Sequence, residues 1–92
     1  MPANQFDVCA GGTVPAGNNT TSLTLTNHHR EACNISGLNL PNANPSGPDY
    51  TVPAKTGPTA GSLTISFTPD AGSYPYSSSC CPQAGNPVIV IQ

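Results

Sequence analysis

Four cysteines are the residues with the clearest chemistry in this 92-residue chain: Cys9, Cys33, Cys80 and Cys81. An even number of cysteines in a short chain rich in Thr, Ser, Asn, Gly and Pro predicts a disulfide framework and an oxidising compartment. Three pairings are open, and the one joining Cys80 to Cys81 is least favoured because it closes a small, strained ring. Either other scheme ties the C-terminal region to both Cys9 and Cys33. Closing a loop of about fifty residues contributes about 4 kcal/mol in the chain-entropy model.

A metal site is the alternative use of these side chains. Cys33, Cys80 and Cys81 with His28 or His29 offer thiolate and imidazole ligands, which suit Zn(II), and thiolates also suit Cu(I). Within that set, we would expect Cys33, Cys81, His28 and His29 as the ligands. The spacing matches no zinc finger or ribbon, however. Structural disulfides are therefore favoured, and no metal or other cofactor is expected.

The polar run His28-His29-Arg30-Glu31 separates two strand-like segments. Because adjacent strand residues point to opposite faces, at most one of the two histidines faces inward. A solvated turn is the favoured interpretation. The functional alternative is a weak surface metal site or a pH-sensitive contact.

Hydrolytic chemistry is suggested only by three serines, residues 77–79, beside Cys80. Asp49 and Asp70 are available acids, yet the chain has no Gly-x-Ser-x-Gly elbow, and nothing links a histidine to a particular serine and aspartate. A flexible loop explains the serine run more simply. We therefore expect no catalytic residues and no enzymatic activity.

The amino-acid composition limits the size of the hydrophobic core. Leu, Ile, Val and Phe number sixteen, about 17% of the chain, which is a thin supply for a core. The net charge is only −2, so little self-repulsion opposes collapse. We expect one domain, residues 1–92, that needs cross-links to support a modest core.

Charge and hydropathy also exclude some partners. Arg30 and Lys55 are the only basic residues besides the histidines, which leaves no electrostatic footprint for nucleic acid or an anionic membrane. No stretch is apolar and long enough for membrane insertion. The start, Met1-Pro2-Ala3-Asn4, lacks the basic and apolar regions of a secretory signal. We nevertheless expect a secreted or cell-surface protein, either in its mature form with an added Met1 or oxidised after synthesis.

Strands, not helices, should position these residues. Eleven prolines and nine glycines interrupt the chain, and no window shows a helical apolar stripe. Polar and apolar residues alternate over 20–27 and 62–68, which predicts two half-buried strands. Further strands are expected over these segments: 6–9, 32–36, 49–52, 74–76 and the continuously apolar 88–91.

Two segments of the chain are expected to be less regular. Residues 1–13 should form an N-terminal arm or strand, and residues 39–61 a long irregular connection with at most one short strand. Six or seven short strands with turns between them indicate a β-sandwich. The predicted core, or its neighbours along each strand, is Leu23, Leu25, Ile35, Leu63, Ile65, Phe67, Tyr76, Val88 and Val90.

A family resemblance rests on two runs. SLTISFTPDAGSYPYSSSCCPQAGNPVIVIQ is similar to the closing part of a cupredoxin, with a strand ending in Phe-Thr, a Pro/Asp-x-Gly turn, Tyr-x-Tyr and a final apolar strand. VPAGNNTTSLTLTNHHREACNI resembles the run that leads to the first copper-ligand histidine. The resemblance covers roughly residues 14–36 and 61–92, and the middle section matches nothing. It implies a small Greek-key antiparallel β-sandwich, cupredoxin-like or Ig-like.

The copper ligands do not follow the resemblance. The first histidine position falls on Cys33, and the Cys, His and Met positions of the metal loop fall on Ser78, Cys81 and Asn86. A serine hydroxyl is a poor substitute for the thiolate of a blue site, and Asn is not the weak axial thioether. The resemblance thus argues against type-1 copper electron transfer. It also implies that a Cys33–Cys81 disulfide replaces the metal, which leaves Cys9 to pair with Cys80.

Two main function classes remain. One is a non-catalytic structural or binding module that presents loops to a protein partner. The other is a self-assembling fibre or coat subunit, in which cysteines bond neighbouring chains and the N-terminal strand adds to the next subunit's sheet. Whether Cys9 pairs within its own chain separates the two. A metal carrier, a third class, would need free thiols.

Overall fold

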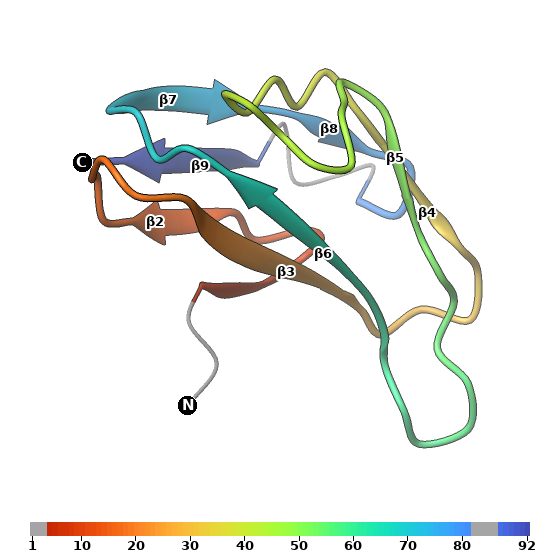
Figure 1. Ribbon diagram of the computed structural model, residues 1–92. Helices are drawn as coiled ribbons and strands as arrows, with labels where there is room; N and C mark the ends of the chain where they lie inside the picture. Colours follow the sequence, from red (N-terminus) through yellow and green to blue (C-terminus); the bar gives the residue numbers. More distant parts are fainter. Residues whose placement is uncertain (1–3, 82–86) are drawn as a thin grey trace.

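The computed structural model describes residues 4–81 and 87–92, which form strands and loops but no helix (Figure 1). Nine strands are found there, in three sheets with the orders β1-β3-β6, β2-β9-β7 and β5-β4-β8. Their bounds are β1 Gln5–Asp7, β2 Gly12–Val14, β3 Thr21–Asn27, β4 Cys33–Ser36, β5 Tyr50–Val52, β6 Gly61–Phe67, β7 Gly72–Pro75, β8 Ser77–Ser78 and β9 Val88–Ile91. The described part of the chain thus offers no helix that could cross a membrane.

The antiparallel pair β3–β6 is the longest ladder. Its register runs from Thr21↔Phe67 to Asn27↔Gly61. Leu23, Leu25 and Ile65 are fully buried on its inner face, and polar residues alternate with them. The two strands predicted from this alternation are confirmed, with ends shifted by one residue.

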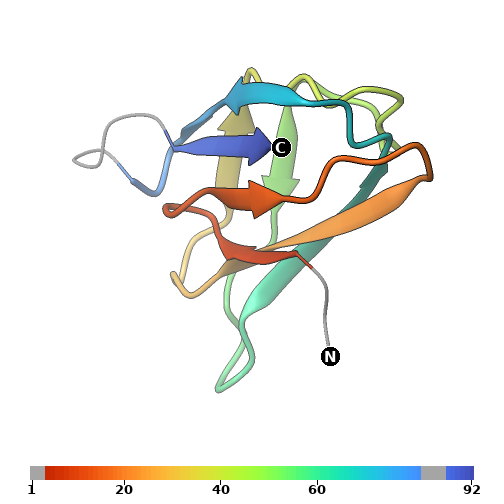
Figure 2. The same cartoon turned by 90° about the vertical axis from the view of Figure 1, so that its left-hand side faces the viewer.

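The N-terminal arm departs from the predicted antiparallel arrangement. β1 pairs with β3, and β2 pairs with β9, and both pairings are parallel. A hairpin forces neighbouring strands to be antiparallel, but no hairpin joins the arm to either partner. Figure 2 shows the arm passing from one sheet to the other. At this crossing Gly11 has φ +65°, and a Cβ there would lie 2.3 Å from the Val88 carbonyl oxygen. The expected antiparallel arrangement therefore holds for the other four strand pairs and is wrong for the arm.

The last strand, β9, lies where the sequence predicts it, but the residues that point into the core are the neighbours of the predicted Val88 and Val90. Ile89 and Ile91 are the fully buried residues, whereas Val88 and Val90 are half-buried. The four-residue run VIVI has no polar alternation, so the sequence could not show which face lies inward. Leu63, on β6, is likewise only partly buried.

The core also draws on segments without a clear strand pattern. The connection predicted over 39–61 contains one strand, β5, as expected. It nevertheless buries more apolar side chains than its irregular sequence suggests. Its buried residues are Leu40, Tyr50 and Val52, and the core also takes in Val8, Val14 and Leu38 from outside the connection; none of the six is in the predicted core.

Candidate functional site

The four cysteines form two intrachain disulfides, Cys9–Cys81 and Cys33–Cys80, each with Cα atoms 5.5 Å apart. A framework that ties the C-terminal region to both Cys9 and Cys33 is confirmed, but the pairing implied by the resemblance is wrong. The reason is the β4–β8 register. Ile35 lies opposite Ser78, so continuing the antiparallel pairing by two residues places Cys33 opposite Cys80. Cys81 then pairs with Cys9 of the N-terminal arm.

The proposed metal ligands do not form a group. Cys33 and Cys81 belong to different disulfides, so neither offers a thiolate in this state. His29 Nε2 lies 3.9 Å from Cys9 Sγ, whereas His28 Nε2 lies 3.9 Å from an Asp7 carboxylate oxygen. Within residues 4–81 and 87–92, no group of three or more His, Cys, Asp or Glu side chains is arranged to hold a metal ion. Of the positions aligned with copper ligands, Asn86 lies outside the described residues.

Ser78 and Ser79 form hydrogen bonds with backbone groups. The Ser79 hydroxyl accepts a hydrogen bond from the Asn34 amide at 3.0 Å, and the Ser79 amide donates to the Asn34 carbonyl. The Ser78 hydroxyl accepts from the Cys80 amide at 3.3 Å. These contacts join β8 to β4 and shape the turn that leads to the cysteine pair. The run is therefore an ordered strand and turn, not the flexible loop expected.

Asn27 is a buried polar residue whose role the sequence did not reveal. It is fully buried at the end of β3. Its side-chain nitrogen Nδ2 donates to the carbonyl groups of Glu31 and Pro53 at 2.8 and 3.0 Å. Its side-chain oxygen accepts from the His29 amide at 2.8 Å. Asn27 thus fixes the turn that carries both histidines. The only sequence signal was an Asn closing the strand in the quoted cupredoxin-like run.

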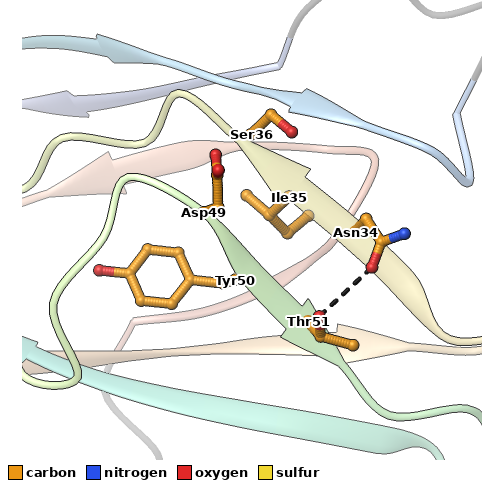
Figure 3. Close-up of a pocket in the computed structure, with 6 residues that line it drawn as sticks. All are labelled: Asn34, Ile35, Ser36, Asp49, Tyr50 and Thr51. Carbon is orange, nitrogen blue, oxygen red and sulfur yellow. Dashed lines mark hydrogen bonds between the residues drawn. The ribbon is translucent and has the colours of Figure 1, made fainter.

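A shallow hollow of about 290 Å³ lies on the β4–β5 pair (Figure 3). It is lined by Asn34, Ile35, Ser36, Asp49, Tyr50 and Thr51. The Thr51 hydroxyl donates to the Asn34 side-chain oxygen at 3.3 Å. Asn34, Ser36, Asp49 and Thr51 are all exposed to solvent. In the sequence, Asp49 is recognisable only as an available acid.

The strands that carry the hollow are anchored in the core by Ile35 and Tyr50. Ile35 is fully buried and Tyr50 nearly so. The Tyr50 hydroxyl donates to the Pro45 carbonyl at 2.9 Å, and burial raises the pKa of this phenol above its ordinary value. The buried side chains of Ile35 and Tyr50 thus anchor the two strands in the core, while the hollow itself is bordered by polar, solvent-facing side chains.

Comparisons with known proteins assign no family. No protein-family model matches the chain, and no curated protein or solved structure matches it. The function must therefore be inferred from the residues and their arrangement.

Proposed function

We propose that this chain is a non-catalytic binding module of the extracellular type, and that the polar hollow on β4–β5 is its contact surface. The Cys33–Cys80 disulfide is the observation that carries the proposal. It joins the first residue of β4 to the turn after β8, so the strand that bears Asn34 and Ser36 is covalently braced. A surface held in its binding conformation loses less conformational entropy when a partner binds.

The proposal of a non-catalytic role is supported by the structural bonds in which the cysteine and serine side chains take part. All four sulfurs are in disulfides, and the hydroxyls of Ser78 and Ser79 accept backbone hydrogen bonds. Two disulfides indicate an oxidising compartment. A secreted or cell-surface location is the proposed setting.

We propose for the overall arrangement a degenerate cupredoxin-like β-sandwich without a type-1 copper site. The alternation in β3 and β6 and the final apolar strand support it.

Intact mass with thiol counting tests the class of function, in parallel with non-reducing electrophoresis and added copper or zinc. The proposal expects four blocked thiols, a mass lower by four protons, one monomer band and no bound metal. A ladder of bands that collapses on reduction would instead indicate a self-assembling fibre or coat subunit. Free thiols with a bound metal would indicate a metal carrier.

A further inference from the structure

We infer that the ligand of the β4–β5 hollow is a small neutral polyol of monosaccharide size. This inference rests on the proposed function and adds the chemical class of the partner. The hollow combines hydrogen-bonding groups of both kinds, and its charge disfavours other ligand classes. Three observations support this assignment: the polarity of the rim, the location of the basic residues and the bracing of Asn34.

The rim presents acceptors and donors together. Asp49 supplies a carboxylate, which only accepts, whereas the Ser36 hydroxyl can donate and accept. Asn34 uses its oxygen to accept from Thr51, which leaves its NH₂ group as a donor. Among the described residues, no hydrogen bond engages the Ser36 hydroxyl, the Asp49 carboxylate or the Asn34 NH₂ group. A vicinal diol, whose hydroxyls both donate and accept, complements such a rim.

Charge disfavours an anionic ligand. Arg30 and Lys55 are the only Arg and Lys residues of the chain, and neither lines the hollow. A phosphate or carboxylate would therefore face the Asp49 carboxylate without a compensating cation. Like charges at short range lower affinity, so anions fit this surface poorly.

Other ligand classes leave part of the rim unused. An apolar ligand would cover the Asp49 carboxylate without replacing its hydrogen bonds to water, which is unfavourable. A simple amine would gain only one solvent-exposed ion pair, and such pairs contribute little. A polyol forms charge-assisted hydrogen bonds to Asp49 and neutral ones to Asn34 and Ser36. The hollow, at about 290 Å³, is at the lower limit of typical small-molecule pockets and suits one sugar ring.

Asn34 is fixed independently of any ligand. Its backbone amide and carbonyl are both hydrogen-bonded to Ser79, and its side-chain oxygen is held by Thr51. The neighbouring Cys33 is in the disulfide with Cys80. The donor group of Asn34 is thus oriented before binding, which lowers the entropic cost of recognition.

Titration of the ¹⁵N-labelled protein, followed by amide chemical shifts, tests this inference. The protein should be made in a host that does not glycosylate the sequon Asn34-Ile35-Ser36. The probes are glucose, galactose, mannose and N-acetylglucosamine, with inorganic phosphate, methylammonium and cyclohexanol as other ligand classes. We expect saturable shifts at Asn34, Ser36 and Thr51 with at least one sugar, and none there with the other probes.

Two variants identify the groups involved. Asp49→Asn should weaken sugar binding about tenfold, because it removes a charge-assisted hydrogen bond. Asp70→Asn, which changes an exposed carboxylate at the β6–β7 turn, should bind like the unmodified chain. Ser36→Ala should weaken binding to a smaller extent. The folded state of each variant is verified from the amide shifts of β3 and β6.

The inference is overturned if no sugar shifts the amides of the hollow, or if phosphate or methylammonium binds there and sugars do not. It also fails if sugars bind but Asp49→Asn binds as tightly as the unmodified chain. None of these results would alter the thiol count, the mass or the monomer band. Failure of the polyol assignment is therefore distinguishable from failure of the proposed function.

Discussion

The pairs β3–β6 and β4–β8 are both antiparallel, but they are stabilised in different ways. β3 and β6 share seven register pairs and bury apolar side chains from both strands. β4 and β8 share two pairs, and β8 contributes only Ser77 and Ser78. The Cys33–Cys80 disulfide lies where the β4–β8 ladder would continue. In this small domain, a covalent link thus stabilises the strand pair that has little apolar surface to bury.

This difference also separates stability from the proposed function. The long ladder, drawn as two long arrows in Figure 1, contributes Leu23, Leu25, Ile65 and Phe67 to the core. The short pair supports the strand that carries the hollow. We therefore expect changes in β3–β6 to affect the whole fold, and changes at Cys33–Cys80 to affect mainly the β5-β4-β8 sheet.

Reduction of both disulfides should produce the largest effect. The bridges span sequence separations of 47 and 72 residues, and each closure contributes about 4 kcal/mol in the chain-entropy model. Loss of both should unfold a domain with so modest a core at moderate temperature. Circular dichroism melts with and without reductant measure the effect. An unchanged Tm in reductant would contradict it.

Truncation of the core in β6 should come next. Phe67 is fully buried, and Phe67→Ala should lower the free energy of unfolding by about 3–5 kcal/mol. Urea unfolding measures this loss. The matched control is Thr64→Ala on the exposed face of the same strand, which should cost much less. Equal effects of the two variants would show that β3–β6 is not stabilised by its buried face.

Asn27 should give an intermediate effect. Asn27→Ala removes hydrogen bonds to four backbone groups, and we expect a loss of about 2–3 kcal/mol. Urea unfolding is again the measurement, with Asn19→Ala in an exposed loop as the control. Amide shifts should change around His29 and Pro53. A variant as stable as the unmodified chain would mean that Asn27 does not organise this turn.

The smallest effect is expected at alkaline pH. Burial, and to a lesser extent the charge of Asp7, raises the pKa of Tyr76 to about 12. An unfolded Tyr ionises near pH 10, so the unfolded chain loses a proton that the folded chain retains. The contribution of Tyr76 to stability should therefore be constant below about pH 10 and fall by about 2 kcal/mol as the pH rises to about 12.

Tyr76→Phe isolates this contribution. The variant loses the hydrogen bond from the Tyr76 hydroxyl to the Val8 carbonyl, so it should be less stable at neutral pH. Its stability should then fall less steeply than that of the unmodified chain between about pH 10 and 12. Parallel pH profiles for the two proteins would contradict the assignment to Tyr76.

The sequence predicted features that depend on local alternation. Leu23 and Leu25 alternate with Ser and Thr, so their strand and its inner face could be read directly. The all-β character followed from the distribution of Pro and Gly. The facing of β9 was missed because Val88 and Ile89 are both apolar, and only packing decides between them.

Features that depend on register or long-range pairing were missed. The partners of Cys80 and Cys81 depend on the β4–β8 register, which only two residue pairs define, Ile35↔Ser78 and Ser36↔Ser77. The hollow depends on the β4–β5 register, which places Asn34 opposite Thr51. Neither register can be read from the sequence, because strands of two to four residues are too short for their alternation to distinguish one pairing from the next.

Amide hydrogen exchange on two single-bridge variants tests the central claim most directly. Cys33→Ser/Cys80→Ser should lose more protection in β4, β5 and β8 than in β3 and β6. Cys9→Ser/Cys81→Ser should retain protection in β4 and β5. If the first variant keeps the β5-β4-β8 sheet fully protected, or if both variants lose protection uniformly, the claim that Cys33–Cys80 specifically braces the surface carrying the hollow is contradicted.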